Sequence, residues 1–251
     1  MTFSQDEVER YARQLVLREI GGPGQQALSR ARVLLVGVGG LGSPAALYLA
    51  ASGVGVLGLM DPDRVAISNL QRQILFTTGD VGAAKVEAAR RRLGALNPHT
   101  RVVTHAQAFT EAAGADLAAD YDLILDGTDD FATRFGVNAV CLAAGRPLVS
   151  GALGRWTAQI GVFVGRPCYR CFVPEAPPDA ETCAVAGVTG PLAGMAGSLM
   201  ALEAIKLIVG AGAPLLGRLL IFDALAGASR TVRIAADPAC PACGAQSGTS
   251  A

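Results

Sequence analysis

The sequence has no excess of charge of either sign. Lys+Arg and Asp+Glu each number 21 among 251 residues, and charged residues make up only 17% of the chain. A protein that binds nucleic acid normally carries a basic excess, because its cations displace the counterions condensed on the phosphates. The balance therefore argues against a nucleic-acid partner. An anionic ligand would have to be held by a few local cations and by backbone donors.

The sequence also lacks an apolar signal-peptide core, repeats and low-complexity tracts. Its first residues, MTFSQDEVERYARQ, are charged and helix-like, which predicts a cytoplasmic protein whose six cysteines stay reduced. The uncharged stretch 184–202 approaches the length of a membrane span, but glycines and a proline interrupt it, and Glu203 and Lys206 follow directly. We expect a buried helix packed on a sheet here rather than a transmembrane helix.

Apolar residues form 51% of the chain, enough for one large α/β domain. Residues 1–30 are typical of two short helices around the turn Gly21–Gly24. Residues 31–61 then predict a strand, a glycine turn, an apolar helix and a second buried strand. Short, continuously apolar strands indicate a parallel sheet covered on both faces. The same alternation continues with helices at 82–93 and 133–144 and strands at 101–109, 121–126 and 147–153.

After this point the pattern changes to strands expected to pair antiparallel, at 157–164, 217–225 and 231–236, the last two joined in a hairpin around Ala226–Ser229. The Pro-rich segment 174–182 is expected to be an exposed mobile loop. The sequence thus predicts one α/β domain over 1–251 with a Rossmann-like mixed sheet. Its expected parts are N-terminal helices at 1–30, a parallel nucleotide-binding part at 31–150, an antiparallel part at 151–243 and a flexible tail at 244–251.

A glycine turn follows the first predicted strand and opens a helix. Gly37 would permit the tight turn, Gly39 would let backbone approach a phosphate, and Gly42 would allow close packing of helix on strand. The helix N-terminus would supply donors for the anion, and Asp61 could accept hydrogen bonds from ribose hydroxyls. The alternative is a turn that only packs. The pattern favours a nucleotide and suits NAD as well as ATP.

Polar residues beyond the strand ends favour ATP. Asn69, Arg72 and Lys85 offer an amide and two cations, which a triphosphate needs more than a dinucleotide does. The alternative is that both cations are ordinary solvated charges. Asp126 and the pair Asp129–Asp130 end another strand at the same edge, where an acid can hold Mg²⁺ or cap the next helix.

Four cysteines form two matched pairs, Cys168-Tyr-Arg-Cys171 and Cys240-Pro-Ala-Cys243. A two-residue spacer lets both thiolates face one tetrahedral ion, so the two pairs predict a closed structural Zn²⁺ site that ties the C-terminal hairpin to the body. The alternatives are redox pairs and buried free thiols. Cys141 lies in an apolar helical run and is expected in the core.

The motifs together resemble the ThiF/MoeB/HesA adenylyltransferases, the bacterial relatives of ubiquitin-activating enzymes. The resemblance extends over nearly the whole chain and rests on motifs in the family's order: RYARQ, GVGGLGS, DPDRVAISNLQRQ, Lys85, DGTDD, CYRC, TCAVAGVTGPLAGMAGSLMALEAIK and CPAC. It implies ATP-dependent adenylylation of the C-terminal Gly-Gly carboxylate of a small ubiquitin-like sulfur carrier of the MoaD or ThiS type. The family is well specified by these motifs and the branch is not.

By this resemblance Asp129 would bind Mg²⁺ and the four paired cysteines would bind Zn²⁺. Arg13 would reach into the ATP site of the partner subunit, which requires a homodimer. Cys183 matches a position where some members carry a thiol nucleophile; the alternative is a small residue at a loop end. The residues around ATP would be Gly37, Gly39, Gly40, Gly42, Asp61, Asp63, Ser68, Asn69, Leu70, Gln71, Arg72, Lys85, Asp129 and Asp130.

Two positions depart from the family's pattern. Asp130 replaces a usual Asn, and its added carboxylate would repel polyphosphate unless Mg²⁺ or a cation such as Arg134 neutralises it. Ala158 replaces a usual glycine before Gln159, a minor change. No rhodanese domain is seen after Cys243, so we expect sulfur from a separate protein. Two alternatives stay open. A nicotinamide-dependent oxidoreductase would need a proton donor near the nicotinamide, but the only histidines, His99 and His105, lie in or beside a predicted connection between a helix and a strand. A catalytically silent relative would not be expected to keep Arg13, Arg72, Lys85 and Asp129.

Overall fold

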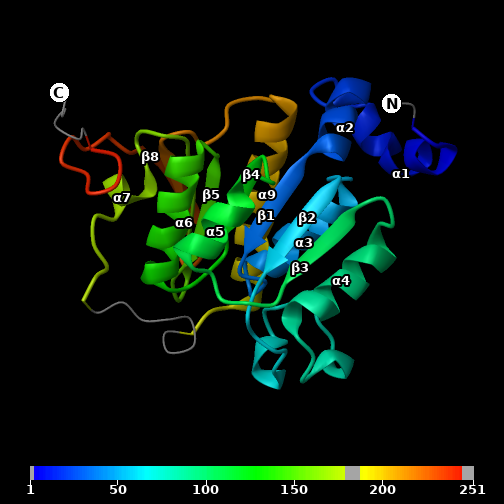
Figure 1. Cartoon of the computed structure of the whole chain (residues 1–251), viewed down its shortest axis with the longest axis horizontal. Coiled ribbons are helices and arrows are strands. Elements are labelled where there is room, and N and C mark those ends of the chain that lie inside the picture. The colour runs from blue at the N-terminus through cyan, green and yellow to red at the C-terminus, as the bar shows by residue number, and fades with distance from the viewer. Residues whose placement is uncertain (1–2, 179–186, 245–251) are drawn as a thin grey trace.

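The computed structural model describes residues 3–178 and 187–244. A single eight-stranded sheet crosses the molecule in the order β3-β2-β1-β4-β5-β6-β7-β8 (Figure 1). Its strands are β1 (Arg32–Val36), β2 (Val56–Met60), β3 (Arg101–His105), β4 (Leu123–Asp126), β5 (Leu148–Leu153), β6 (Thr157–Phe163), β7 (Arg218–Asp223) and β8 (Ala228–Arg233).

The predicted change from parallel to antiparallel pairing is confirmed. The strands β1 to β5 pair in parallel, with Val36 opposite both Met60 and Asp126. From β5 onward each neighbour is antiparallel, and Asp223 opposite Ala228 closes the β7–β8 hairpin. The apolar runs of β1 and β4 are buried on both faces, as expected for strands in the middle of a covered sheet.

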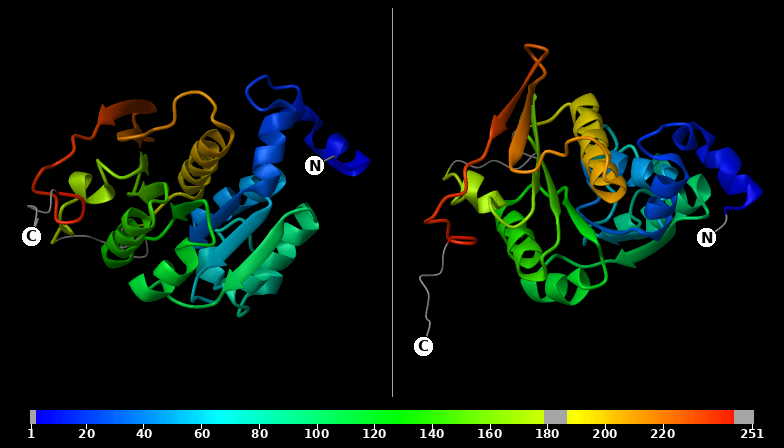
Figure 2. Two further views of the ribbon diagram at one scale, coloured as in Figure 1. Left: turned by 45° about the horizontal axis from the view of Figure 1, so that its top comes forward. Right: turned by 90° about the horizontal axis from the view of Figure 1, so that it is seen from above.

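Helices cover both faces of the sheet in three layers (Figure 2). On one face α2, α3, α4 and α9 enclose the larger apolar core, whereas α5, α6 and α7 pack over a second cluster on the other. The helices are α1 (Gln5–Leu15), α2 (Gly21–Arg30), α3 (Gly42–Ala51), α4 (Lys85–Leu96), α5 (Glu111–Ala118), α6 (Phe131–Ala144), α7 (Tyr169–Phe172) and α9 (Gly190–Val209), with 3-10 turns η1 (Ile67–Asn69) and η2 (Thr78–Asp80).

One local prediction was wrong, and one helix was not predicted. The segment Gly21–Gly24 forms the first turn of α2 and does not connect two helices; the connection is 16–20. Pro23 fits the first turn of a helix because the N–H it lacks has no intrahelical acceptor there. The helix α5 was not predicted, since its Ala-rich sequence shows little apolar periodicity and buries only Gly114 and Ala118.

The apolar helix α9 is packed against the sheet, as predicted. In the described part of the chain it is the one helix that is long and apolar enough to cross a membrane by length and composition alone. It contacts β5, β6 and α3, and its Gly197 lies so close to Leu41 that an added Cβ would sit 2.2 Å from the Leu41 carbonyl oxygen. This close approach explains a glycine in the middle of a helix.

The direction of the strand order reverses between β1 and β4. This switch point determines where a ligand site is expected. In open α/β sheets ligands bind outside the carboxyl ends of the strands at such a switch. Here the loop after β1 touches the loop after β4, because a Cβ on Gly37 would lie 3.1 Å from the Gly127 carbonyl. Any ligand at the switch point would therefore meet both loops at once.

Candidate nucleotide and metal sites

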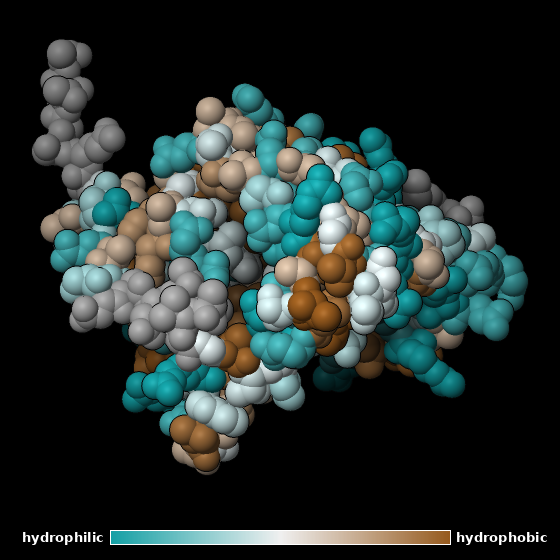
Figure 3. All heavy atoms as spheres, turned by 90° about the horizontal axis from the view of Figure 1, so that it is seen from below, coloured by the Kyte–Doolittle hydropathy of each residue, from teal (hydrophilic) through white to brown (hydrophobic). Residues whose placement is uncertain are grey.

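A cavity of about 780 Å³ opens at the carboxyl edge of the parallel strands. This is within the usual range for a site that takes a small molecule. Figure 3 looks onto this edge from below and shows polar surface around a compact apolar patch. The cavity brings together most of the predicted nucleotide residues: Gly37, Gly39, Gly40, Asp61, Asp63, Asn69, Arg72, Lys85, Asp129 and Asp130.

The glycines of the first turn have the steric roles expected of them. Gly37 adopts a φ of 85°, a backbone conformation that favours glycine. Gly42 lies outside the cavity lining, and a Cβ there would meet the Gly37 carbonyl oxygen at 2.0 Å. Gly39 and Gly40 leave the backbone of the turn open toward the cavity. The turn thus presents main-chain donors to a ligand at the N-terminus of α3.

Asp61 and Lys85 form a buried charged pair at the floor of the cavity. Asp61 accepts hydrogen bonds from the backbone N–H of Val38 at 2.8 Å and of Asp63 at 2.9 Å, which tie it to the glycine turn. The Lys85 ammonium lies 2.7 Å from Asp63 Oδ2 and 3.8 Å from Asp61 Oδ1. With only 5% of its surface exposed, Lys85 is not an ordinary solvated charge.

The segment between β2 and α4 supplies the second cation. Arg72 lines the cavity and donates a hydrogen bond to the Ser68 carbonyl at 3.0 Å. The Asn69 side chain accepts a hydrogen bond from the Ala66 N–H at 3.1 Å and so braces the same turn. Of the other predicted ligands in this run, Ser68, Leu70 and Gln71 do not line the cavity.

The loop after β4 carries the predicted Mg²⁺ residue. Asp129 is exposed at the cavity, whereas Asp130 accepts a hydrogen bond from the Thr133 N–H at 2.7 Å and so forms the N-cap of α6. In this capping role, one oxygen of the Asp130 carboxylate is already hydrogen-bonded to the helix backbone. Arg134, expected as the cation that neutralises Asp130, lies instead against Asp126 and the Thr128 carbonyl.

Asp126 is buried at the end of β4, with 1% of its surface exposed. Burial raises the pKa of its carboxyl, and Arg134 together with hydrogen bonds from Thr128 and Ser150 acts in the opposite direction. Thr128 donates to Asp126 through both its N–H, at 3.0 Å, and its hydroxyl, at 2.7 Å. Asp126 therefore shapes the loop rather than facing a ligand directly.

Gln73 and Tyr169 are two polar residues of the cavity that the sequence analysis did not single out. Gln73 is 4% exposed, and its Oε1 has no hydrogen-bond partner among the described residues. The spacing of Asn69, Arg72 and Gln73, three and four residues apart, is a signal that could have placed it on the same side of a turn. Tyr169 is the second; it stands between two cysteines and gave no separate signal.

The four paired cysteines converge as predicted. Their sulfur atoms all lie within 4.8 Å of one another, with 3.6 Å between Cys168 and Cys240 and 3.4 Å between Cys171 and Cys243. Backbone N–H groups point at the sulfurs, from Asp237 to Cys171 at 3.4 Å and from Cys243 to Cys240 at 3.5 Å. Such donors favour thiolates, and four thiolates in a closed cluster suit a metal ion.

The surroundings of Cys240 favour the thiolate form of its side chain. Burial raises the pKa of Cys240, but the backbone N–H groups of Cys243 and Ala242 and the neighbouring thiols lower it to about 7. A thiolate is the form that binds metal, so this sulfur needs little further change to act as a ligand. Cys141, by contrast, is 4% exposed in the second core cluster, and burial raises its pKa.

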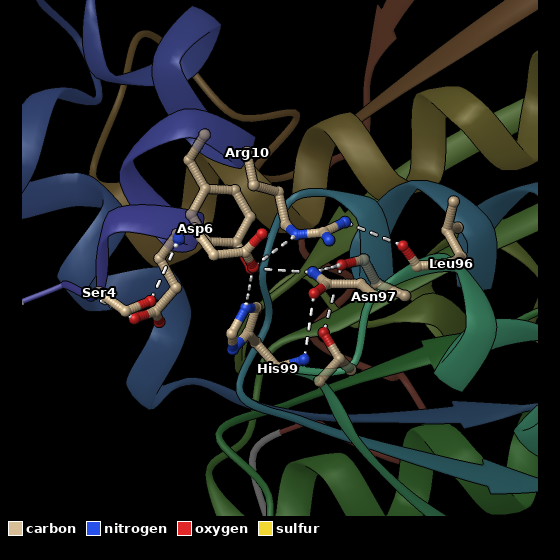
Figure 4. A network of polar contacts seen from close by, with 10 residues as sticks. Ser4, Asp6, Arg10, Leu96, Asn97 and His99 are labelled. Carbon is tan, nitrogen blue, oxygen red and sulfur yellow. Dashed lines mark hydrogen bonds and ion pairs between the residues drawn. The ribbon is translucent and has the colours of Figure 1, made fainter.

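Arg13 lies outside the cavity of its own chain. Its helix α1 is anchored to the connection between α4 and β3 through a polar network (Figure 4). Asp6 is 2.7 Å from the His99 ring, and Arg10 donates to the Leu96 carbonyl at 3.0 Å. On the buried side the Tyr11 hydroxyl accepts a hydrogen bond from Asn97 at 2.9 Å. These contacts fix α1 and leave Arg13 exposed.

Several remaining predictions concern the segment around 179–186. Cys183 lies outside the described residues. The Pro-rich segment 174–182 is described only over 174–178, and this part is exposed as expected. The tail after Gly244 is likewise outside them.

Ala158 is fully buried in β6, where its methyl group packs in the larger core, so the replacement of a glycine there is accommodated.

Comparison with known proteins places these features in a family. A family model described as the ThiF family matches residues 11–242. The chain is 44% identical to a sulfur carrier protein adenylyltransferase of Thermus thermophilus, over 97% of this chain and 93% of that one. It is 46% identical to the molybdopterin-synthase adenylyltransferase of Escherichia coli, over 96% and 98% respectively.

Some relatives are longer. The adenylyltransferase and sulfurtransferase MOCS3 of Sus scrofa is 49% identical over 96% of this chain, which spans only 54% of its length. Among solved structures, E. coli MccB with ATP superposes with a TM-score of 0.81 at 25% identity, over 93% of this chain and 74% of that one.

Proposed function

The chain belongs to the ThiF family, and we propose that it is an adenylyltransferase that uses ATP to activate the C-terminal Gly-Gly carboxylate of a small ubiquitin-like sulfur carrier. The observation that carries the proposal is the buried Lys85 with Asp61 beneath the glycine turn, in a cavity that also contains Arg72 and Asp129. This set of charges suits a triphosphate. Relatives at 44% and 46% identity that are named adenylyltransferases support the same reaction.

The reaction would proceed by positioning and electrostatics. The carrier carboxylate oxygen attacks the α-phosphorus of ATP, the bond from that phosphorus to the bridging oxygen breaks, and pyrophosphate leaves an acyl-adenylate behind. A carboxylate is ionised at neutral pH, so the chain need not supply a general base. Its task is to hold the phosphates against the backbone donors of the glycine turn, with Lys85 and Arg72 compensating the charge that builds on them.

The donor atoms on this chain fit the two metals proposed with the reaction. Asp129 would hold Mg²⁺, which prefers carboxylate oxygens and neutralises phosphate charge. The four converging cysteines would hold Zn²⁺ in a closed, structural site, since none of the four positions is left for a substrate. The cysteine cluster lies at the start of α7 and at the C-terminal end of the described chain, so it would tie the β7–β8 hairpin to the body.

The oxidoreductase alternative finds neither of the two histidines at the cavity. His99 pairs with Asp6, and the His105 ring lies 3.3 Å from the Tyr121 hydroxyl. Neither histidine lines the cavity. We further propose, as the sequence predicted, a cytoplasmic protein that receives sulfur from a separate donor.

The test of the proposed function is ATP–pyrophosphate exchange with the wild-type chain. Each Gly-Gly carrier encoded by the same organism is added in turn with Mg²⁺ and labelled pyrophosphate. We expect exchange that depends on one carrier and disappears when its C-terminal glycine is deleted. Tight NADH binding together with no exchange on any carrier would replace the proposal by the oxidoreductase.

The proposed active sites are shared between two copies of the chain. Arg13 lies outside its own cavity, on a helix that is firmly anchored to the body. Large apolar side chains stay exposed near it, with Val16 77% and Leu17 48% exposed, and others surround the cavity segment, such as Ile67 at 73%. Exposed apolar surface of this kind is typical of a subunit interface.

Mixing two inactive variants should therefore restore activity. Arg13→Ala subunits and Lys85→Met subunits each lack one cation, but a heterodimer contains one composite site with both. We expect exchange to rise on mixing toward about a quarter of the wild-type rate, because random reassociation makes half of the dimers mixed and each has one intact site. No recovery in heterodimers verified by affinity tags would mean that Arg13 acts in its own chain or not at all.

Cys183 is proposed as a nucleophile that takes the acyl group from the adenylate or helps to pass sulfur. Adenylylation itself needs no thiol, so the two steps can be separated. Cys183→Ser should leave pyrophosphate exchange at the wild-type rate and slow formation of carrier thiocarboxylate, which mass spectrometry follows directly. Thiocarboxylate formed equally fast by the variant would leave Cys183 a structural residue.

A further inference from the structure

One residue belongs to both the cysteine cluster and the nucleotide cavity. Tyr169 stands between Cys168 and Cys171 in the sequence, is 5% exposed and lines the cavity. Its ring packs edge-on against Phe163 with 5.7 Å between centroids and lies tilted on Phe135 at 6.2 Å. The position of the Tyr169 side chain is therefore set by the knuckle, the segment 168–171 that carries the two cysteines.

Arg134 extends the connection to the loop after β4. It is 5% exposed, donates a hydrogen bond to the Thr128 carbonyl and lies against the Asp126 carboxylate. Its guanidinium also lies close to the Tyr169 hydroxyl, and each of the two groups affects the pKa of the other. Burial alone would lower the pKa of Arg134, but Asp126 and Tyr169 more than offset this and raise it, so the guanidinium stays charged.

Helix α6 makes a second contact with the same knuckle. Asn138 follows Arg134 by four residues, which places both side chains on one face of the helix. It is 1% exposed, accepts a hydrogen bond from the Tyr169 N–H at 2.9 Å and points its amide at Cys168 Sγ, 3.7 Å away. The knuckle, the first two turns of α6 and the loop 127–130 thus form one connected set.

We propose that Tyr169 and Arg134 are positioning residues through which the four-cysteine site holds the loop that carries Asp129 in its nucleotide-binding form. Both residues line the cavity, but the hydrogen bond of Arg134 goes to the Thr128 carbonyl and its guanidinium lies beside Asp126 and Asp129, so the loop is what the two residues hold in place. The proposal rests on the proposed function and adds to it that the metal site and the ATP site are energetically coupled. By reciprocity, a change at either site alters binding at the other by the same factor.

The test removes one hydroxyl. Tyr169→Phe keeps the ring packing and the cysteines but removes the hydroxyl that lies beside the Arg134 guanidinium. We expect the Kd for ATP, measured by calorimetry with Mg²⁺, to rise about threefold to tenfold. In pyrophosphate exchange the KM for ATP should rise with kcat nearly unchanged, and the amides of 127–131 should exchange hydrogen faster. The metal content should stay at the wild-type value.

Tyr121→Phe is the matched control. Tyr121 is 3% exposed, its hydroxyl lies 3.3 Å from the His105 ring, Arg32 lies over its ring, and it does not line the cavity. Losing this buried hydroxyl should change stability without changing the Kd for ATP. An equal Kd in wild type, Tyr169→Phe and Tyr121→Phe would overturn the proposal while leaving the proposed function intact. No ATP binding by the wild type would overturn both.

Removing the metal provides an independent arm. A chelator should raise the Kd for ATP in the wild type and have less effect in Tyr169→Phe, in which the connection is already cut. This non-additivity is what a double-mutant cycle measures. Metal removal that weakens ATP binding equally in both proteins would show that Tyr169 does not carry the coupling. The Tyr169→Phe comparison with metal bound decides the matter even if the stripped protein unfolds.

Discussion

Replacing Lys85 by methionine should lower the rate of carrier-dependent pyrophosphate exchange about a hundredfold to a thousandfold, the loss typical of a well-placed cation removed from a preorganised site. Methionine keeps the length of the side chain, so the change deletes charge with little change in volume. The ammonium is held 2.7 Å from Asp63 and 3.8 Å from Asp61, already beside the glycine turn. It would therefore stabilise the phosphates without having to be repositioned.

The chain provides an unusually direct control, because its only other lysine is Lys206. That ammonium is also ion-paired, 2.6 Å from Glu203, but lies on α9 away from the cavity. Each substitution leaves a buried carboxylate without its cation, Asp61 or Glu203, so both variants should lose stability. Only Lys85→Met should lose exchange; rates within about threefold of each other would contradict the assigned role.

Replacing Cys240 by serine should abolish tight metal binding and strongly destabilise the chain. Structural zinc sites contribute on the order of 10 kcal/mol of binding energy, and for a chain of this size each kcal/mol corresponds to about 2–4 °C in Tm. We expect at least about a 10 °C fall in Tm, with one zinc ion per chain in the wild type and none in the variant. Elemental analysis and thermal unfolding measure the two effects.

Cys141→Ala is the control for this experiment. Cys141 is a buried thiol outside the cluster, and its truncation should cost about 1–2 kcal/mol through lost packing while leaving zinc content unchanged. Wild-type protein purified without chelators that contains no zinc would refute the metal assignment.

The features that could be predicted from the sequence are those fixed by local chemistry. The turn at Gly37–Gly42 is recognisable because the steric role of each glycine depends on residues within the same six-residue segment. Asp61 is recognisable because it directly follows the next strand, β2. The cysteine pairs were recognisable for the same reason, since a two-residue spacer is itself the ligand geometry. Continuous apolar strands likewise predicted which part of the sheet is parallel.

The features that escaped prediction depend on contacts between distant segments. Nothing near Arg134 in the sequence indicates that its partners are Asp126 and Tyr169, the latter 35 residues further along the chain. For the pair Asp129–Asp130 the sequence offered both a Mg²⁺ ligand and a helix cap, and it did not indicate that Asp130 is the acid that caps α6. Arg13 shows the limit most clearly, because its predicted site belongs to another copy of the chain, which no single fold contains.

The separation of the two cysteine pairs has a topological consequence. A metal ion that joins Cys168 to Cys240 spans 72 residues, closing a loop that contains α9 and the β7–β8 hairpin. Cross-links over loops of this length remove on the order of 4 kcal/mol of chain entropy from the unfolded state. A peptide bond cut within the exposed stretch 174–178 would leave two fragments that are joined by the ion as well as by the packing of α9 in the core and of β7 on β6. Nicked protein would therefore behave as a single particle, and its C-terminal third would be released only when both the ion and this packing are removed.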